Sequence, residues 1–138
     1  MTISMLRKES EGKLEFFPPA SSDKIHELTK RFHGFSLTEY IAFLHESNGV
    51  GELFSEGSLR FVRNMILFDL DEALHWSQAA YQDSHLVIGA PGVDGIFFVL
   101  DQKGQQVFAH MPIDNEFVKV ADSVFDLLSK SLAGELRL

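Results

Sequence analysis

The apolar positions near the start of the chain follow helical spacing. Ile25, Leu28 and Phe32 are three or four residues apart, as one face of a helix requires. Ser21-Ser22-Asp23 supplies an N-cap, and Gly34 is the kind of residue that often follows a helix. The pattern therefore predicts an amphipathic helix over residues 23–32.

A second helix is predicted over residues 37–46. Its apolar stripe consists of Leu37, Tyr40, Ile41 and Leu44. Ser36 is followed three residues later by Glu39, the spacing of a capping box. Asn48-Gly49 then predicts the stop, because both residues tolerate positive φ.

Two further helices are predicted nearer the C-terminus. One is capped by Asp69 or Asp71 and runs to about Tyr81. The last covers about residues 117–132. Its apolar face consists of Phe117, Val120, Ala121, Val124, Leu127 and Leu128.

Short apolar runs between these helices predict strands, and residues 51–57 are expected to be a loop. The expected strands cover residues 59–62, 65–68, 85–88, 96–100 and 106–110. Asp101-Gln102-Lys103-Gly104 predicts a hairpin turn, which makes the strands on either side antiparallel.

This order of elements predicts an α+β fold, with a mostly antiparallel central sheet packed by about four helices. The chain has 138 residues, which suits one domain. Residues 1–15 are mainly polar and are expected to form an N-terminal arm, with the domain spanning residues 16–138. Phe16-Phe17 supplies an apolar anchor, and Pro18-Pro19 a stop.

Charge narrows the choice of partner. The net charge is −8, from 12 basic and 20 acidic residues, which argues against nucleic acid and anionic membranes and favours a basic protein. Residues 64–102 contain no Lys or Arg. The contact candidates in this stretch are Asp69, Asp71, Glu72, Asp83 and Asp94, with Trp76 as either an anchor or half-buried core.

Candidate chemistry is sparse. The chain has no cysteine, which removes disulfides and thiolate metal sites and fits a cytoplasmic location. The histidines show no metal-ligand spacing, and no G-x-S-x-G elbow is present. Gly89, Gly92 and Gly95 precede a strand instead of a helix, which favours a turn over a phosphate loop. We therefore expect no catalytic residue, metal or cofactor.

Several segments, in order, resemble the SUKH superfamily of bacterial toxin-immunity proteins and the yeast cell-wall assembly regulator. Residues 35–44 with 48–50 resemble its "LP-x-x-Y-x-x-F-L…NGG" helix and turn, and residues 85–89 its "hhhIG" strand. Residues 94–101 are similar to "G-D-x-h-x-h-D", with Gly and Asp exchanged, and residues 120–128 to "IA-x-SF-x-E-h-L". The positions that match these motifs are Tyr40, Leu44, Asn48, Gly49, Ile88, Gly89, Gly95, Ser123 and Phe125.

The resemblance covers about residues 16–132. It implies an α+β sheet packed by helices, no catalytic residues, and a protein-binding role such as neutralising a nuclease or deaminase toxin. A regulatory or scaffold module that binds another cytoplasmic protein is the alternative. A small hydrolase or ligand-binding domain remains a third hypothesis, which a pocket lined by His33, His45 or His110 together with acids would support. The pattern does not fix an oligomeric state.

Overall fold

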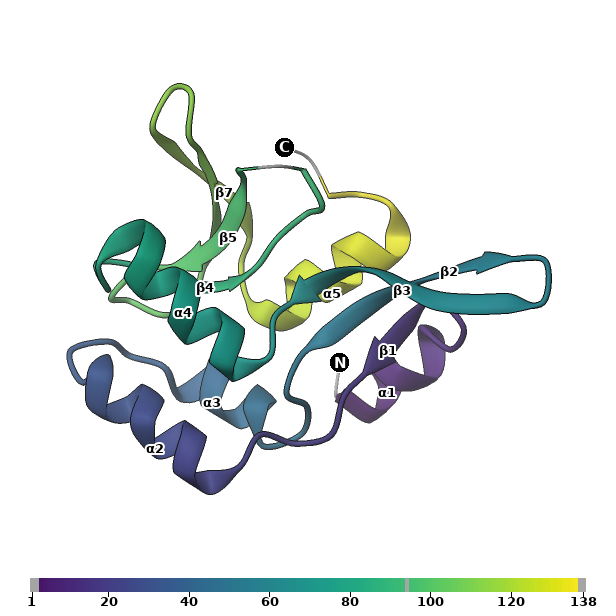
Figure 1. Ribbon diagram of the computed structural model, residues 1–138, viewed down its shortest axis with the longest axis horizontal. Coiled ribbons are helices and arrows are strands. Elements are labelled where there is room, and N and C mark those ends of the chain that lie inside the picture. The colour runs from purple at the N-terminus through teal and green to yellow at the C-terminus, as the bar shows by residue number, and fades with distance from the viewer. Residues whose placement is uncertain (1–2, 94, 137–138) are drawn as a thin grey trace.

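The computed structural model describes residues 3–93 and 95–136 (Figure 1). Within these ranges the helices are α1 (Ile3–Glu9), α2 (Ser22–Arg31), α3 (Thr38–Leu44), α4 (Leu70–Tyr81) and α5 (Val124–Ala133). The strands are β1 (Leu14–Phe16), β2 (Val50–Glu56), β3 (Leu59–Leu67), β4 (Leu86–Gly89), β5 (Phe97–Leu100), β6 (Val107–Met111) and β7 (Glu116–Ala121). The predicted α+β single domain is confirmed. No helix in the described part is long and apolar enough to cross a membrane.

The described strands form two antiparallel sheets, where the sequence pattern had indicated one central sheet. Strand order is β1-β2-β3 in the first and β4-β5-β6-β7 in the second, so every strand pairs with its neighbour in sequence. The sheets meet where the chain leaves β3. There the Phe68 amide donates to the Ile88 carbonyl at 2.8 Å.

Gly89 allows the close approach at this junction. A Cβ on Gly89 would lie 1.8 Å from the Ile66 carbonyl oxygen, so only glycine fits without moving the backbone. Leu67 and Ile88 are fully buried beside it and join the main core. The "hhhIG" segment of the family resemblance, residues 85–89, therefore ends in a glycine that the packing of this fold requires.

α4 lies against β4 through a buried serine. The Ser77 hydroxyl donates to the Ala73 carbonyl at 2.7 Å and accepts from the Val87 amide at 2.8 Å. Both of its hydrogen-bonding roles are thereby satisfied in a site with no exposure. The contact fixes the position of α4 along the second sheet.

The other motif positions also have structural roles. Tyr40 and Leu44 are buried in the core, and Phe125 packs edge-to-face on Phe43 at 6.0 Å between ring centroids. Ser123 caps α5 by accepting from the Asp126 amide at 2.9 Å. Gly95 has φ 81°, in the left-handed region that suits glycine.

The C-terminal segment differs from the sequence prediction. Residues 116–121 form strand β7, which pairs with β6, and the helix begins only at Val124. Alternating β-branched residues at Val118 and Val120 favour a strand, and the Ser123 cap begins a new helix. The prediction of one helix over 117–132 is wrong for residues 117–123.

The predicted loop over residues 51–57 is also wrong. This segment is β2, which pairs with a single long β3 in place of the two short strands expected. Register shifts on both sides of Gly51 and Glu52 interrupt the alternation of side chains, which is the pattern that identifies a strand from sequence.

The expected capping box does not form either. Glu39 Oε1 accepts from the Val124 amide at 3.0 Å, so it caps the distant α5. Most of the segment expected to be an arm is folded: residues 3–9 form α1, whose Leu6 is fully buried. β1 then pairs with β2, which holds this segment in the first sheet.

We expect Gly89→Ala to lower the free energy of unfolding by about 3 kcal/mol or more, because the new methyl group meets backbone. Gly34→Ala is the control: a Cβ there meets nothing within 4 Å, and we expect a change within about 0.5 kcal/mol. Urea denaturation followed by circular dichroism measures both. Equal effects of the two substitutions would contradict the steric explanation.

Candidate functional site

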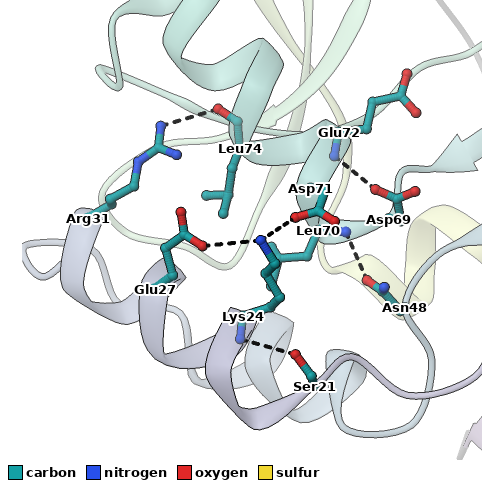
Figure 2. Close-up of polar contacts among 10 residues, drawn as sticks. All are labelled: Ser21, Lys24, Glu27, Arg31, Asn48, Asp69, Leu70, Asp71, Glu72 and Leu74. Carbon is teal, nitrogen blue, oxygen red and sulfur yellow. Dashed lines mark hydrogen bonds and ion pairs between the residues drawn. The ribbon is translucent and has the colours of Figure 1, made fainter.

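The start of α4 is fixed by two side chains from different segments (Figure 2). Asp69, the N-cap, accepts from the Glu72 amide at 2.8 Å, and Asn48 Oδ1 accepts from the Leu70 amide at 2.8 Å. A Cβ on Gly49 would lie 3.1 Å from the Asp69 nitrogen, so this turn packs tightly against the helix start. The cap thus orients the Asp69 carboxylate.

Asp71, another predicted contact residue, bridges to α2. Lys24 Nζ lies 2.7 Å from Asp71 Oδ1 and 3.5 Å from Glu27 Oε2 (Figure 2). The hydrogen bond and the charge of Asp71 raise the pKa of Lys24 above its usual value. Both side chains of the Lys24–Asp71 pair are largely exposed, so this bridge is a weak tie between the helices.

Asp83 lies beyond the other end of α4. It adopts φ 63° and accepts two bonds from Arg31, at 2.8 Å from Nη2 and 3.3 Å from Nε. Arg31 also donates to the Leu74 carbonyl at 3.2 Å. Because the 12 residues of α4 span about 18 Å, Asp71 and Asp83 do not form one compact patch.

Trp76 is partly buried and packs on Phe97, with 5.2 Å between ring centroids. Its Nε1 donates to Glu72 Oε1 at 3.4 Å. Of the two readings of this residue, half-buried core describes its place in the structure. Asp94 lies outside the described residues.

A groove joins two of the predicted acids to apolar residues that sequence reasoning left out. It has a volume of about 500 Å³. Its lining consists of Phe17, Pro18, Pro19, Asn48, Met65, Asp69 and Glu72. Pro18 and Pro19, just before the N-cap of α2, were the sequence feature that could have indicated this groove. They are exposed, and exposed apolar residues that lie together often mark a binding surface.

The groove combines apolar walls with a negative rim. A lysine or arginine side chain could lay its alkyl stem on Phe17 and Met65 and bring its cation to Asp69 and Glu72.

Tyr40 is a buried tyrosine near Asp69. Burial and then the charge of Asp69 raise the pKa of Tyr40 far above its usual value, so its hydroxyl stays neutral. That hydroxyl has no hydrogen-bond partner among the described residues.

A second cluster lies past the far end of α4. The Phe117 ring stacks on His85 at 4.3 Å and on His110 at 4.4 Å, with interplanar angles of 10° and 16°. His85 precedes β4 and Phe117 belongs to β7, so the first and last strands of this sheet are bridged across its face. The predicted helix over 117–132 placed Phe117 away from the sheet, so this cluster was not predicted.

Both ring nitrogens of His110 have hydrogen-bond partners in this cluster. Its Nε2 lies 2.9 Å from Asn115 Oδ1, which only accepts, so Nε2 carries the proton. In the neutral tautomer with its proton on Nε2, Nδ1 accepts from the Tyr81 hydroxyl at 2.6 Å. Burial raises the pKa of Tyr81 to about 12, which keeps it a donor. Asn115 adopts φ 53° in the β6–β7 turn, a conformation asparagine tolerates.

The histidines of the hydrolase hypothesis are not brought together. His33 and His45 are exposed, and the groove beside His110 has no Asp or Glu in its described lining. Among residues 3–93 and 95–136, no three His, Asp or Glu side chains are placed to hold a metal ion. No family model matches the chain, and a search of curated proteins finds no match to it.

We expect the Arg31–Asp83 pair to couple α2 to α4 by about 1 kcal/mol, since it is bidentate and about two-thirds buried. A double-mutant cycle with Arg31→Gln and Asp83→Asn, read by urea denaturation, measures this coupling. The exposed pair of Lys24→Gln and Asp71→Asn is the matched cycle, with a smaller coupling expected. A larger coupling in the exposed pair would refute this ranking.

Stability should fall in acid because of His85. Burial, opposed by Asp101 and assisted by His110, lowers the pKa of His85 below 6.5. The unfolded chain then binds the proton first, so the stability due to neutral His85 is present above pH 6.5 and is lost as pH falls through the folded pKa. His85→Phe keeps a stacking ring without the charge.

We expect this variant to show a shallower loss of stability between neutral and mildly acidic pH than the unmodified protein. Thermal melts across this range measure the difference, and a proton NMR titration of His85 gives its pKa directly. A His85 pKa at or above 6.5 would remove the basis of the prediction.

Proposed function

We propose that this protein is a non-catalytic protein-binding domain that acts as a SUKH-type immunity protein, neutralising a basic toxin domain such as a nuclease or deaminase. The observation that carries the proposal is the groove at the start of α4. It places Asp69 and Glu72 beside the apolar side chains of Phe17 and Met65. Such a surface suits a basic side chain of a partner protein.

The two acids of the groove differ from Asp71 and Asp83 in their ion pairing. Asp71 and Asp83 are neutralised by Lys24 and Arg31. Asp69 and Glu72, in contrast, have no ion-pair partner among the described residues, although both accept hydrogen bonds. Their negative charge is therefore available to a partner, which narrows the predicted contact set to these two acids.

The overall charge supports the same partner. A net charge of −8 attracts a basic protein over distance and raises its association rate, while the short-range contacts of the groove govern dissociation. A nuclease domain is a suitable partner because it needs basic residues to hold phosphate. A regulatory module with another basic partner would use the same groove, so the identity of the bound protein separates the two functions.

We expect this protein, used as bait in its native cell, to retain a basic partner at low salt and to lose it as salt rises. Glu72→Lys should slow association with that partner about tenfold or more and change dissociation less, because it reverses charge at the rim. Glu72 is a suitable site because its side chain is outside the helix cap.

Glu135→Lys is the control: it makes the same charge change at an exposed position beyond α5. Mass spectrometry identifies the partner, and surface plasmon resonance gives the two rates. A toxin domain as partner supports immunity, whereas another cytoplasmic protein supports the regulatory alternative. Absence of any partner at low salt, or equal association by both variants, would refute the proposed surface.

A further inference from the structure

The β2–β3 hairpin extends beyond the rest of the molecule (Figure 1). β1 pairs only with Val50–Glu52 of β2, and the Leu53 amide still donates to the Lys13 carbonyl at 2.9 Å. Beyond Leu53 the hairpin is a two-stranded ribbon, closed by a turn in which Gly57 adopts φ 63°. Its outer half therefore has little support from the body of the domain.

One face of this ribbon is apolar and exposed. Phe54 pairs directly with Phe61, with ring centroids 5.4 Å apart, and Leu59 follows on the same face by strand alternation. These side chains are 40%, 43% and 68% exposed. On the opposite face the end of the Arg60 side chain reaches back to Gly12 in the α1–β1 turn. We call the exposed face, formed by Phe54, Glu56, Leu59, Phe61 and Arg63, the hairpin strip.

Opposite charges flank the apolar part of the strip. Arg63 lies over the Phe54 ring, with its guanidinium carbon 5.5 Å from the centroid, at the end nearest the body. Glu56, two residues from Phe54 and opposite Leu59, lies at the tip on the same face. From the body outward the strip thus holds a base, then the aromatic pair, then an aliphatic and an acidic side chain side by side, and its ends are about 13 Å apart along the strands.

Because the strip has a base at one end and an acid at the other, two strips that run in opposite directions bring opposite charges together. A two-fold axis that lies between two such faces and runs across the strands reverses one hairpin relative to the other. Glu56 of each copy then faces Arg63 of the other, and the Phe54–Phe61 pairs meet in the middle. The strip holds one acid and one base, so it fits a second copy better than the strongly basic partner that suits the groove, whereas the net charge of −8 on each chain opposes association.

We propose that two copies of this chain form an isologous dimer through the hairpin strip. The strip is small beside the roughly 800 Å² that each partner buries in a stable interface, so the dimer is weak and forms at micromolar or higher concentrations. The proposal is independent of the groove and of its partner.

Sedimentation velocity of the full chain over a wide concentration range tests the dimer. We expect a monomer–dimer equilibrium. Phe61→Ser should weaken it about tenfold or more, because this residue lies at the centre of the strip. Ile113→Ser is the control: it removes an apolar side chain that is 97% exposed on the other hairpin and should leave the equilibrium unchanged.

A charge exchange tests the orientation without removing apolar surface. Glu56→Arg alone should weaken the dimer about tenfold by placing two cations together, and adding Arg63→Glu should restore it to within about threefold of the original. Far-ultraviolet circular dichroism checks that each variant is folded. A monomer at every concentration would overturn the proposal, and so would a dimer that Ile113→Ser weakens while Phe61→Ser and Glu56→Arg do not.

Discussion

The close approach of the two sheets at Gly89 is the constraint on which the rest of the architecture depends. The Ile66 carbonyl occupies the space that a side chain at Gly89 would need, and the Phe68 amide is then in place to donate to Ile88. Because the chain must turn directly from this junction into α4, Asn48 and Asp69 can cap the helix from either side. The cap in turn places Asp69 on the rim of the groove, so packing at one glycine positions a candidate binding surface.

Sequence patterns predicted the features that local chemistry determines. α2, α3 and α4 were found because their apolar residues are regularly spaced, and α2 and α4 also begin after a serine or aspartate cap. The same reasoning failed where distant partners decide the structure. Glu39 has capping-box spacing but caps α5, 85 residues away, and Phe117 fits a helical stripe but is held in a strand by β6. Strand pairing and long-range hydrogen bonds cannot be predicted from the local pattern of a single sequence.

The candidate site was predicted only in part for a similar reason. An acidic stretch is visible in the sequence, yet its residues differ in their ion pairing in the folded structure. Lys24 and Arg31 of α2 neutralise Asp71 and Asp83, whereas Asp69 and Glu72 line the groove beside apolar surface. Which acids are paired depends on where α2 lies relative to α4, and this was not predictable from composition. The distribution of charge along a chain therefore indicates which region can bind a partner. The folded structure determines which acids of that region stay unpaired and can contact the partner.

The order of the strands also bears on how the chain reaches this structure. In the second sheet every strand pairs with the next one along the chain, across short connections, so its contacts close small loops. The first sheet differs, because Leu14 of β1 must find Glu52 of β2 after two intervening helices have been made. Low contact order favours early formation, so the β4–β7 meander is the part of the molecule expected to organise first during folding. The N-terminal strand and α1 would then dock late, as the last pieces to close over the core.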